Sequence, residues 1–426
     1  MTKDYNEFRA HWRVIVAAAI GVGAGVTGAM VYSLSILITP LTDTFGWTRA
    51  EVSGAKTFLT LGFVVTAPFV GYIADRFGVR KIAMVSLFGL AVAMFGMTQM
   101  NGNIIVFYAS IFALSLAGSC TTPLVWTRGV ATWFEEKRGL ALGLTLTGTG
   151  VAGFMVPVFV GGLVDRYDWR AGYLVMGVAA LLAIIPVYFL FFENGRVNKK
   201  TVAEAAKPET RTSSALQSGF TVPEALKTIR FWQLAFAFTL IGGMISSLMV
   251  HLVPLLTDSG MSRSLAVRIA GLMGVAVILG RVTTGFLVDR FHPPYVAAFF
   301  LAMPVIGCLL LSGGTPALGL VMAAAIFIGL AAGSEVDLVP YLTARYFGLK
   351  AYGKLYGAVF IFFYAGVGIV PPAFGYVFDL YGNYDLALDF AVAALGIGVL
   401  AVATLGRAPD FTVVDPSSAP VSEAAK

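Results

Sequence analysis

Four ionisable side chains lie inside long apolar stretches, where they could do chemistry. Arg281 stands eight residues before Asp289, at the polar end of its stretch, so it lies about 12 Å deep at about 1.5 Å per helical residue. A guanidinium at that depth costs about 3 kcal/mol, and its planar fork of donors suits a carboxylate. We expect Arg281 either to bind an organic anion or to form an ion pair with Glu335 or Asp337.

The other three are two acids and a histidine. Glu335 and Asp337 are two residues apart, hence about 200° apart on a helix, so we expect one to line a pathway and the other to pack. A carboxyl group in a low-dielectric setting can hold a proton at neutral pH, as proton coupling requires. His251 is a candidate proton relay or a packed side chain. It has no second ligand at metal-binding spacing, so we expect no metal and no cofactor.

Hydroxyl and aromatic side chains at similar depth form a wider candidate set. As a group they would suit a compact organic anion, although helix packing is the alternative role for each of them. The candidate substrate-binding residues, besides Arg281, are Tyr32, Thr121, Thr122, Phe360, Phe363, Tyr364 and Tyr384.

These residues must be positioned by membrane helices. The 426 residues are 58% hydrophobic and only 12% charged, against about 25% charged in soluble domains. Spans need about 20 apolar residues, and the runs lack the alternation of a β-barrel. The sequence therefore predicts an all-α membrane protein with twelve spans, at 14–39, 52–74, 82–100, 103–127, 139–163, 172–192, 231–256, 265–288, 294–312, 316–342, 353–377 and 385–406.

Charge placement predicts the orientation. Most of the 29 Lys and Arg residues fall in the tails and in loops on one side, which indicates cytoplasmic N- and C-termini in the plasma (cell inner) membrane. The net charge of +6 then reflects topology, and we expect no nucleic-acid partner. The basic residues expected near the outer side are Arg49, Lys56, Arg166, Arg170, Arg263 and Arg268.

A polar segment divides the chain into two halves. We expect a six-helix bundle at 1–192, a cytoplasmic linker at 193–228, a second bundle at 229–407 and a flexible tail at 408–426. The halves repeat each other, because spans 2 and 8 both end in a Gly-x-x-x-Asp-Arg pattern, and spans 5 and 11 each end in Gly and Asp. Such repeats are typical of secondary transporters, whose sites lie between them.

The end of span 2 also resembles a family signature. Gly71, Asp75, Arg76 and Arg80, with Gly78 and Lys81, match the G-x-x-x-D-R-x-G-x-R-K pattern of the major facilitator superfamily. The resemblance implies two pseudo-symmetric six-helix bundles that work by alternating access, with this cluster as a conformational latch.

Two further stretches narrow the resemblance to monocarboxylate porters and oxalate/formate antiporters. They are 133–153, which is rich in glycine, and 333–357, which contains both acids. Two features differ from the animal monocarboxylate porters. Span 1 lacks their opening signature and intramembrane lysine, and Val277 stands where they carry an aspartate.

From these features we expect a transporter and not an enzyme. The resemblance implies proton-coupled symport of small organic monocarboxylates, with Arg281 binding the anion and Asp337, Glu335 or His251 coupling the proton. Partners would be the anion, protons and membrane lipid, and we expect a monomer. The alternatives are organic anion exchange, efflux of lipophilic cations, which Arg281 would oppose, and a non-transporting sensor. The chain has no nucleotide-binding G-x-x-x-x-G-K-[ST] sequence, so an ATP-driven pump is not expected.

Overall fold

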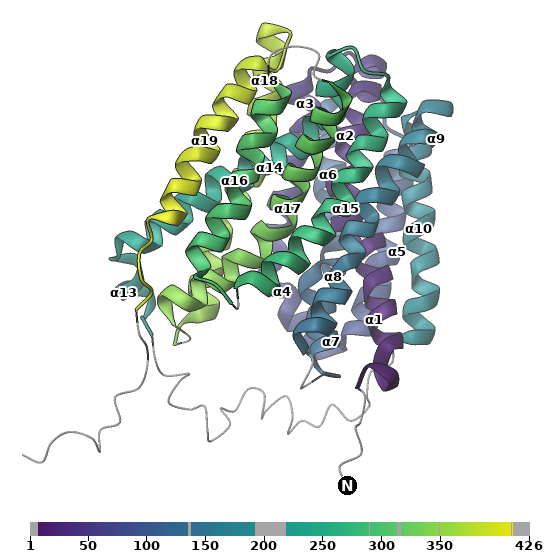
Figure 1. The fold of residues 1–426 in the computed structure, drawn as a ribbon. Helices are drawn as coiled ribbons and strands as arrows, with labels where there is room; N and C mark the ends of the chain where they lie inside the picture. The colour runs from purple at the N-terminus through teal and green to yellow at the C-terminus, as the bar shows by residue number, and fades with distance from the viewer. Residues whose placement is uncertain are drawn as a thin grey trace, which may run out of the picture.

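A computed structural model describes residues 7–134, 138–191, 219–288, 290–312, 317–348, 350–409 and 411. Within them, twelve helical segments are long and apolar enough to cross a membrane, and they stand side by side as one bundle (Figure 1). The all-α, twelve-span prediction is confirmed. Residues 193–218 of the expected linker, Asp289 and most of the expected tail lie outside the described residues.

Several spans of the first half consist of more than one helix. Span 1 contains α1 (Glu7–Ala24) and α2 (Val26–Phe45), and span 2 contains α3 (Arg49–Ser53) and α4 (Ala55–Phe77). The remaining elements are α5 (Val79–Met97), α6 (Ile104–Gly118), a 3₁₀ turn η1 (Ser119–Thr121), α7 (Pro123–Ala131), α8 (Arg138–Met155), a π-helical turn η2 (Val156–Val160), α9 (Gly161–Arg166) and α10 (Trp169–Leu190).

The second half is more regular. A short helix α13 (Val222–Leu226) precedes six helices that each form one span. These are α14 (Ile229–Asp258), α15 (Arg263–Val288), α16 (Pro293–Leu311), α17 (Leu318–Phe347), α18 (Tyr352–Tyr381) and α19 (Asp385–Ala403).

The break in span 1 has a local cause. Gly25 is extended (φ −72°, ψ 176°), so the helical hydrogen-bond pattern stops there and the backbone N–H of Val26 loses its helical acceptor. The Thr121 hydroxyl accepts that hydrogen bond at 2.9 Å. A side chain at Gly25 would collide with Thr121 at 2.8 Å. The broken parts of spans 1 and 4 therefore fix each other.

Among the described residues, the two halves meet chiefly along four pairs of helices: α8 with α15, α3 with α18, α4 with α18, and α2 with α14. At the first crossing the backbones nearly touch, because a Cβ atom on Gly274 would lie 2.2 Å from the carbonyl carbon of Gly153. Glycines thus permit the close approach of two helices from different halves.

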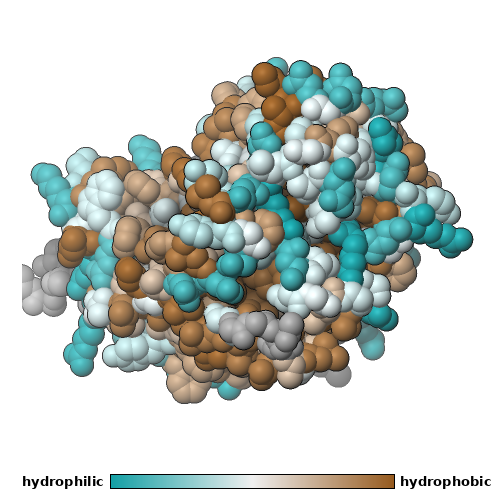
Figure 2. All heavy atoms as spheres, turned by 90° about the horizontal axis from the view of Figure 1, so that it is seen from above, coloured by the Kyte–Doolittle hydropathy of each residue, from teal (hydrophilic) through white to brown (hydrophobic). Residues whose placement is uncertain are grey.

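The two ends of the molecule differ. Arg49 begins α3 at one end, which we call the Arg49 end, and Glu7 begins α1 at the other, which we call the terminus end (Figure 1). Hydrophilic side chains gather across the middle of the Arg49 end (Figure 2). Among the described residues, polar contacts between the halves lie at the Arg49 end or at mid-helix.

Candidate functional site

Arg281 lies at the interface between the halves. Its Nη1 donates to the carbonyl oxygen of Leu146 at 3.2 Å and lies 3.4 Å from the hydroxyl of Thr149, both on α8. Its Nε lies 3.1 Å from a carboxylate oxygen of Asp337 on α17. This Nε makes no hydrogen bond, so charge and not hydrogen-bond geometry holds the pair. The guanidinium therefore touches both halves without using all its donors.

The two acids of α17 have different surroundings. Asp337 pairs with Arg281 and keeps about 35% of its side-chain surface exposed. Glu335 is 6% exposed, and its Oε2 is buried without a hydrogen-bond partner. A buried carboxylate oxygen without a donor is unfavourable unless it is protonated or meets a ligand. The expected separation of their roles agrees with this geometry.

Lys56 is the residue that the sequence analysis misplaced. We expected it near the outer surface, but it is 4% exposed inside the span that runs from Arg49 to Phe77. The reason is that α3 and α4 continue almost without interruption, which carries Lys56 seven residues beyond Arg49. Its ammonium group interacts electrostatically with Glu335 of the other half.

No salt bridge or side-chain hydrogen bond joins Lys56 to any residue that the structure describes. The charge interaction with Glu335 therefore acts over more than contact distance. Lys56 already lay inside the predicted run 52–74, and an unpaired charge within an apolar run was the signal that could have identified it.

Tyr32 completes a group that we call the central cluster: Tyr32, Lys56, Arg281, Glu335 and Asp337. The Tyr32 side chain is buried on α2, and its phenol interacts electrostatically with Arg281 and Glu335. Four of the cluster's five members were predicted from the sequence as site residues, and Lys56 was not. The five side chains come from α2, α4, α15 and α17. Both halves thus contribute to one charged group in the middle of the membrane spans.

Other predicted substrate residues have structural partners. Thr121 holds the break in span 1, and the Thr122 hydroxyl donates to the carbonyl of Ser119 at 2.9 Å. Phe363 packs against Gly242 of α14, where a Cβ atom would lie 2.5 Å from its ring.

The aromatic residues of α18 form a ladder. Phe360 lies 5.3 Å from Phe363 and 4.8 Å from Tyr364 between ring centroids, and Tyr364 faces Phe63 of the first half at 6.3 Å. The ring centroids of Tyr356 and Phe360 lie 5.0 Å apart, with the two rings tilted by 45°. Tyr356 also interacts electrostatically with Asp337. The ladder therefore leads toward the central cluster along one helix.

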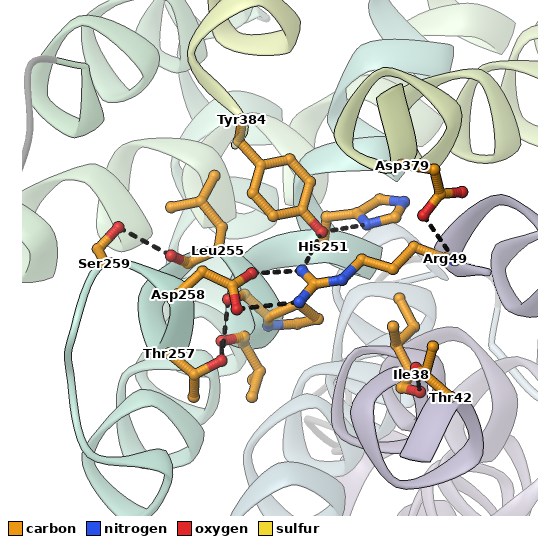
Figure 3. A network of polar contacts seen from close by, with 12 residues as sticks. Ile38, Thr42, Arg49, His251, Leu255, Thr257, Asp258, Ser259, Asp379 and Tyr384 are labelled. Carbon is orange, nitrogen blue, oxygen red and sulfur yellow. Dashed lines mark hydrogen bonds and ion pairs between the residues drawn. The ribbon is translucent and has the colours of Figure 1, made fainter. Parts of the chain in front are cut away.

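A second polar group, the Arg49 network, closes the Arg49 end (Figure 3). Arg49 donates from Nη1 and Nη2 to both carboxylate oxygens of Asp258, the second at 2.9 Å, and from Nη1 to the Tyr384 hydroxyl at 2.7 Å. The backbone N–H groups of Arg49 and Ala50 donate to Asp379 at 3.0 and 2.9 Å. Its guanidinium carbon lies 3.6 Å from the centroid of the Phe378 ring.

His251, the predicted relay, belongs to this network. Its Nε2 lies 3.0 Å from the Pro371 carbonyl, which only accepts, so Nε2 carries the proton and Nδ1 accepts from the Tyr384 hydroxyl at 3.0 Å. The predicted substrate residue Tyr384 thus links His251 to Arg49. Burial raises the pKa of Tyr384 above its usual value, which keeps its phenol protonated as a donor.

A related contact lies at the position that is equivalent to the Arg49–Asp379 contact in the repeat of the two halves. Arg263, which begins α15, pairs with Asp165 at the end of α9, and its Nη2 donates to the Ile36 carbonyl at 2.6 Å. Asp165 and Asp379 are the acids that end spans 5 and 11 in the sequence repeat. Each of them receives donors from the first residues of a helix in the opposite half, so the repeat encodes paired contacts at this end.

The predicted latch lies at the terminus end. Asp75 pairs with Arg128 of α7, and a Cβ atom added at Gly71 would lie 3.5 Å from Nη1 of that same guanidinium. Arg76 donates to Tyr72 at 3.0 Å, and Arg80 donates to the carbonyl of Tyr188. The partners named here all belong to the first half.

Comparisons with known proteins agree with this architecture. The Major Facilitator Superfamily profile matches residues 20–371. Among curated relatives, monocarboxylate transporter 12 of Xenopus laevis is 21% identical, covering 91% of this chain and 88% of its own. Monocarboxylate transporter 11 of Mus musculus is 25% identical, covering 88% and 83%. The uncharacterised transporter YhjX of Escherichia coli is 22% identical, covering 86% and 87%.

Solved structures give the same fold. A bacterial homologue of the lysosomal transporter Spinster aligns with a TM-score of 0.65 at 15% identity, covering 95% of this chain and 97% of its own. A D-xylose–proton symporter aligns with a TM-score of 0.68 at 13% identity, covering 94% and 98%.

Proposed function

The chain belongs to the Major Facilitator Superfamily and is a multi-pass membrane transporter, and from this premise we propose that it is a proton-coupled symporter of small organic monocarboxylates. The observation that carries the proposal is Arg281, whose guanidinium lies at the interface of the halves with donors unused. Similarity to monocarboxylate transporters 11 and 12 supports the choice of anion.

The charges of the central cluster favour symport. Lys56 and Arg281 contribute two positive charges, and Glu335 and Asp337 contribute two negative charges, so the empty carrier is neutral there. Adding one monocarboxylate and one proton leaves it neutral again. A carrier can move a charged site through a low-dielectric interior only at high cost. The empty and fully loaded forms therefore reorient, and a carrier holding the anion alone does not.

This neutrality argues against the exchange alternative. An antiporter must prevent the empty carrier from reorienting, which an uncompensated charge in the empty site would achieve. The cluster has no such excess charge among the described residues when both acids are ionised. Cation efflux is disfavoured because two buried cations would repel the substrate.

We further propose that both termini are cytoplasmic, following the excess of basic residues on that side. The Arg49 end is then the outer end, and its cross-half network closes the outer pathway. On this reading the protein is closed at its outer end, as in an inward-facing carrier.

The proposal is tested by uptake of radiolabelled pyruvate, lactate and benzoate into proteoliposomes containing the full chain, with an inside-alkaline pH gradient. We expect accumulation above equilibrium for at least one of these acids. Arg281→Ala should reduce the initial rate at least about a hundredfold, because a bidentate charged contact contributes about 3 kcal/mol. The matched control is Arg268→Ala, which removes an exposed arginine of the same helix that bonds only to Ser264.

Two outcomes would contradict the proposal. Uptake that requires preloaded anion and ignores the pH gradient would establish exchange instead. Uptake by Arg281→Ala equal to that of Arg268→Ala would show that Arg281 does not bind the anion.

A further inference from the structure

We propose that Lys56 and Glu335 form one site for the anion and the proton, in which the substrate carboxylate lies between the Lys56 ammonium and the protonated Glu335 carboxyl. This inference rests on the proposed function and assigns its coupling to two particular side chains. It arises because Lys56 makes no salt bridge or side-chain hydrogen bond among the described residues and Glu335 Oε2 has no donor. In the same cluster Arg281 pairs with Asp337 but keeps an unused donor for the anion.

The first step is the state of Lys56. The ammonium is almost completely buried and has no hydrogen-bond acceptor among the described side chains. A buried cation is stable only with a counter-charge and acceptors. Glu335 supplies the counter-charge from the opposite half, but at more than contact distance. An acceptor that comes between them would satisfy Lys56, and a carboxylate is the acceptor with matching charge.

The second step is the state of Glu335. Its Oε2 has no donor, and a second carboxylate placed beside it would be repelled while Glu335 is ionised. Proton uptake removes that repulsion and turns Oε2 from an acceptor into a donor. The proton on Glu335 then forms a hydrogen bond to one oxygen of the carboxylate that Arg281 binds, and the second oxygen also accepts from Lys56. Anion binding and proton binding therefore require each other at one place.

The neighbouring titratable groups are consistent with Glu335 as the acid that takes up the proton. The groups with charge interactions around the two acids are Tyr32 from α2, Lys56 from α4, Arg281 from α15 and Tyr356 from α18. Asp337, on α17 itself, is the other acid of the cluster, and it is already neutralised by contact with Arg281. Glu335 is thus the acid whose charge changes with least disturbance of existing contacts.

The substrate class also follows. Two cations in one cluster would suit a dicarboxylate, but a neutral loaded carrier would then need two protons. One unpartnered acid accepts one proton, so the site fits a single carboxylate. Because Lys56 belongs to the first half and Glu335 and Arg281 to the second, the bound anion connects the halves, which couples binding to their closure.

The test compares two transport modes in proteoliposomes of the full chain. Accumulation under an inside-alkaline gradient requires coupling, whereas exchange of radiolabelled for unlabelled pyruvate at equal pH requires only binding and reorientation of the loaded carrier. The variants are Lys56→Met, Lys56→Arg, Glu335→Gln and Asp337→Asn. Lys354→Met, an exposed lysine of α18, is the control, and size-exclusion profiles confirm folding.

We expect Glu335→Gln to lose accumulation at least tenfold while it retains exchange that no longer varies with pH, because the amide is a permanent donor. Asp337→Asn should keep a KM for exchange that varies with pH, because Glu335 must still take up a proton before the anion binds. Lys56→Met should raise the KM for exchange at least tenfold, Lys56→Arg should raise it less, and Lys354→Met should match wild type.

Accumulation by Glu335→Gln at the wild-type level would overturn the assignment of the proton. An unchanged KM in Lys56→Met would overturn the assignment of the anion. If wild-type protein exchanges pyruvate without any response to pH, the proposed symport itself fails. The KM of Lys56→Met then still decides whether the anion binds at Lys56, so the two failures are distinguishable.

Discussion

The Arg49 network and the central cluster are both charged groups that join the two halves, yet they differ in whether their polar atoms have hydrogen-bond partners. In the Arg49 network the side chains of Arg49, Asp258, Tyr384 and His251 all have polar partners, and none of their atoms is buried without one (Figure 3). In the central cluster, Arg281 Nε and Glu335 Oε2 have no hydrogen bond. Contacts that satisfy each other hold a closed state, whereas unsatisfied groups await a ligand.

Of the variants that test this comparison, Arg49→Ala should have the largest effect, and it should act on the population that is open at the Arg49 end. It removes the contacts to Asp258 and Tyr384 and leaves a carboxylate without its donor, which costs about 2 kcal/mol. The population open at the Arg49 end should rise about thirtyfold. Spin labels at Gln99 and Asn383, in loops of different halves at that end, would measure the change as a longer distance between them.

Arg170→Ala is the matched control for that experiment. Arg170 lies at the same end, but its contacts stay within the first half, at Asp168, Trp169 and Thr98. An equal response of the two variants would mean that loss of charge, and not loss of the cross-half contact, opens the molecule.

Asp337→Asn tests the central cluster by removing one of its internal contacts, which should strengthen substrate binding. The substitution removes the carboxylate that competes with substrate for Arg281, so pyruvate should bind about tenfold more tightly, equivalent to about 1.4 kcal/mol. Transport should slow, because the empty carrier then has an excess positive charge. Calorimetric titration in detergent measures the affinity, and a weaker affinity than wild type would show that Asp337 is itself part of the anion site.

Tyr384→Phe should have a smaller effect on the Arg49 network. The phenol donates to His251 and accepts from Arg49, but the bidentate contact of Arg49 with Asp258 remains. Loss of one such hydroxyl costs about 1 kcal/mol, so the spin-label distribution should shift about fivefold. A shift as large as that of Arg49→Ala would identify Tyr384 as the main contact.

Thr149→Val should have the smallest effect. It removes a hydroxyl that lies 3.4 Å from Arg281, while the contacts with Leu146 and Asp337 remain. We expect a change in KM for exchange of less than about threefold, since a long hydrogen bond contributes under about 1 kcal/mol. A tenfold change would mean that Thr149 binds the substrate directly.

The sequence was sufficient for the fold and for part of the site. Long apolar runs predicted twelve spans because lipid leaves few other backbone arrangements, and Arg281, Glu335 and Asp337 were conspicuous as charges within them. Lys56 was misjudged because it follows Arg49, the first residue of α3, closely in sequence. Which acid pairs with Arg281, and that Tyr384 and His251 belong to the Arg49 network, depend on packing between distant helices, which periodicity does not encode.

The redundancy of the contacts at the Arg49 end has a consequence for the energised membrane. Asp258, Tyr384 and Asp379 come from different elements and all hold the first turn of α3, so breaking one leaves the others in place. Separation must then be nearly all-or-none. In the proposed symport, a carrier with that property would spend little time half open, the state in which protons could move down their gradient without cargo.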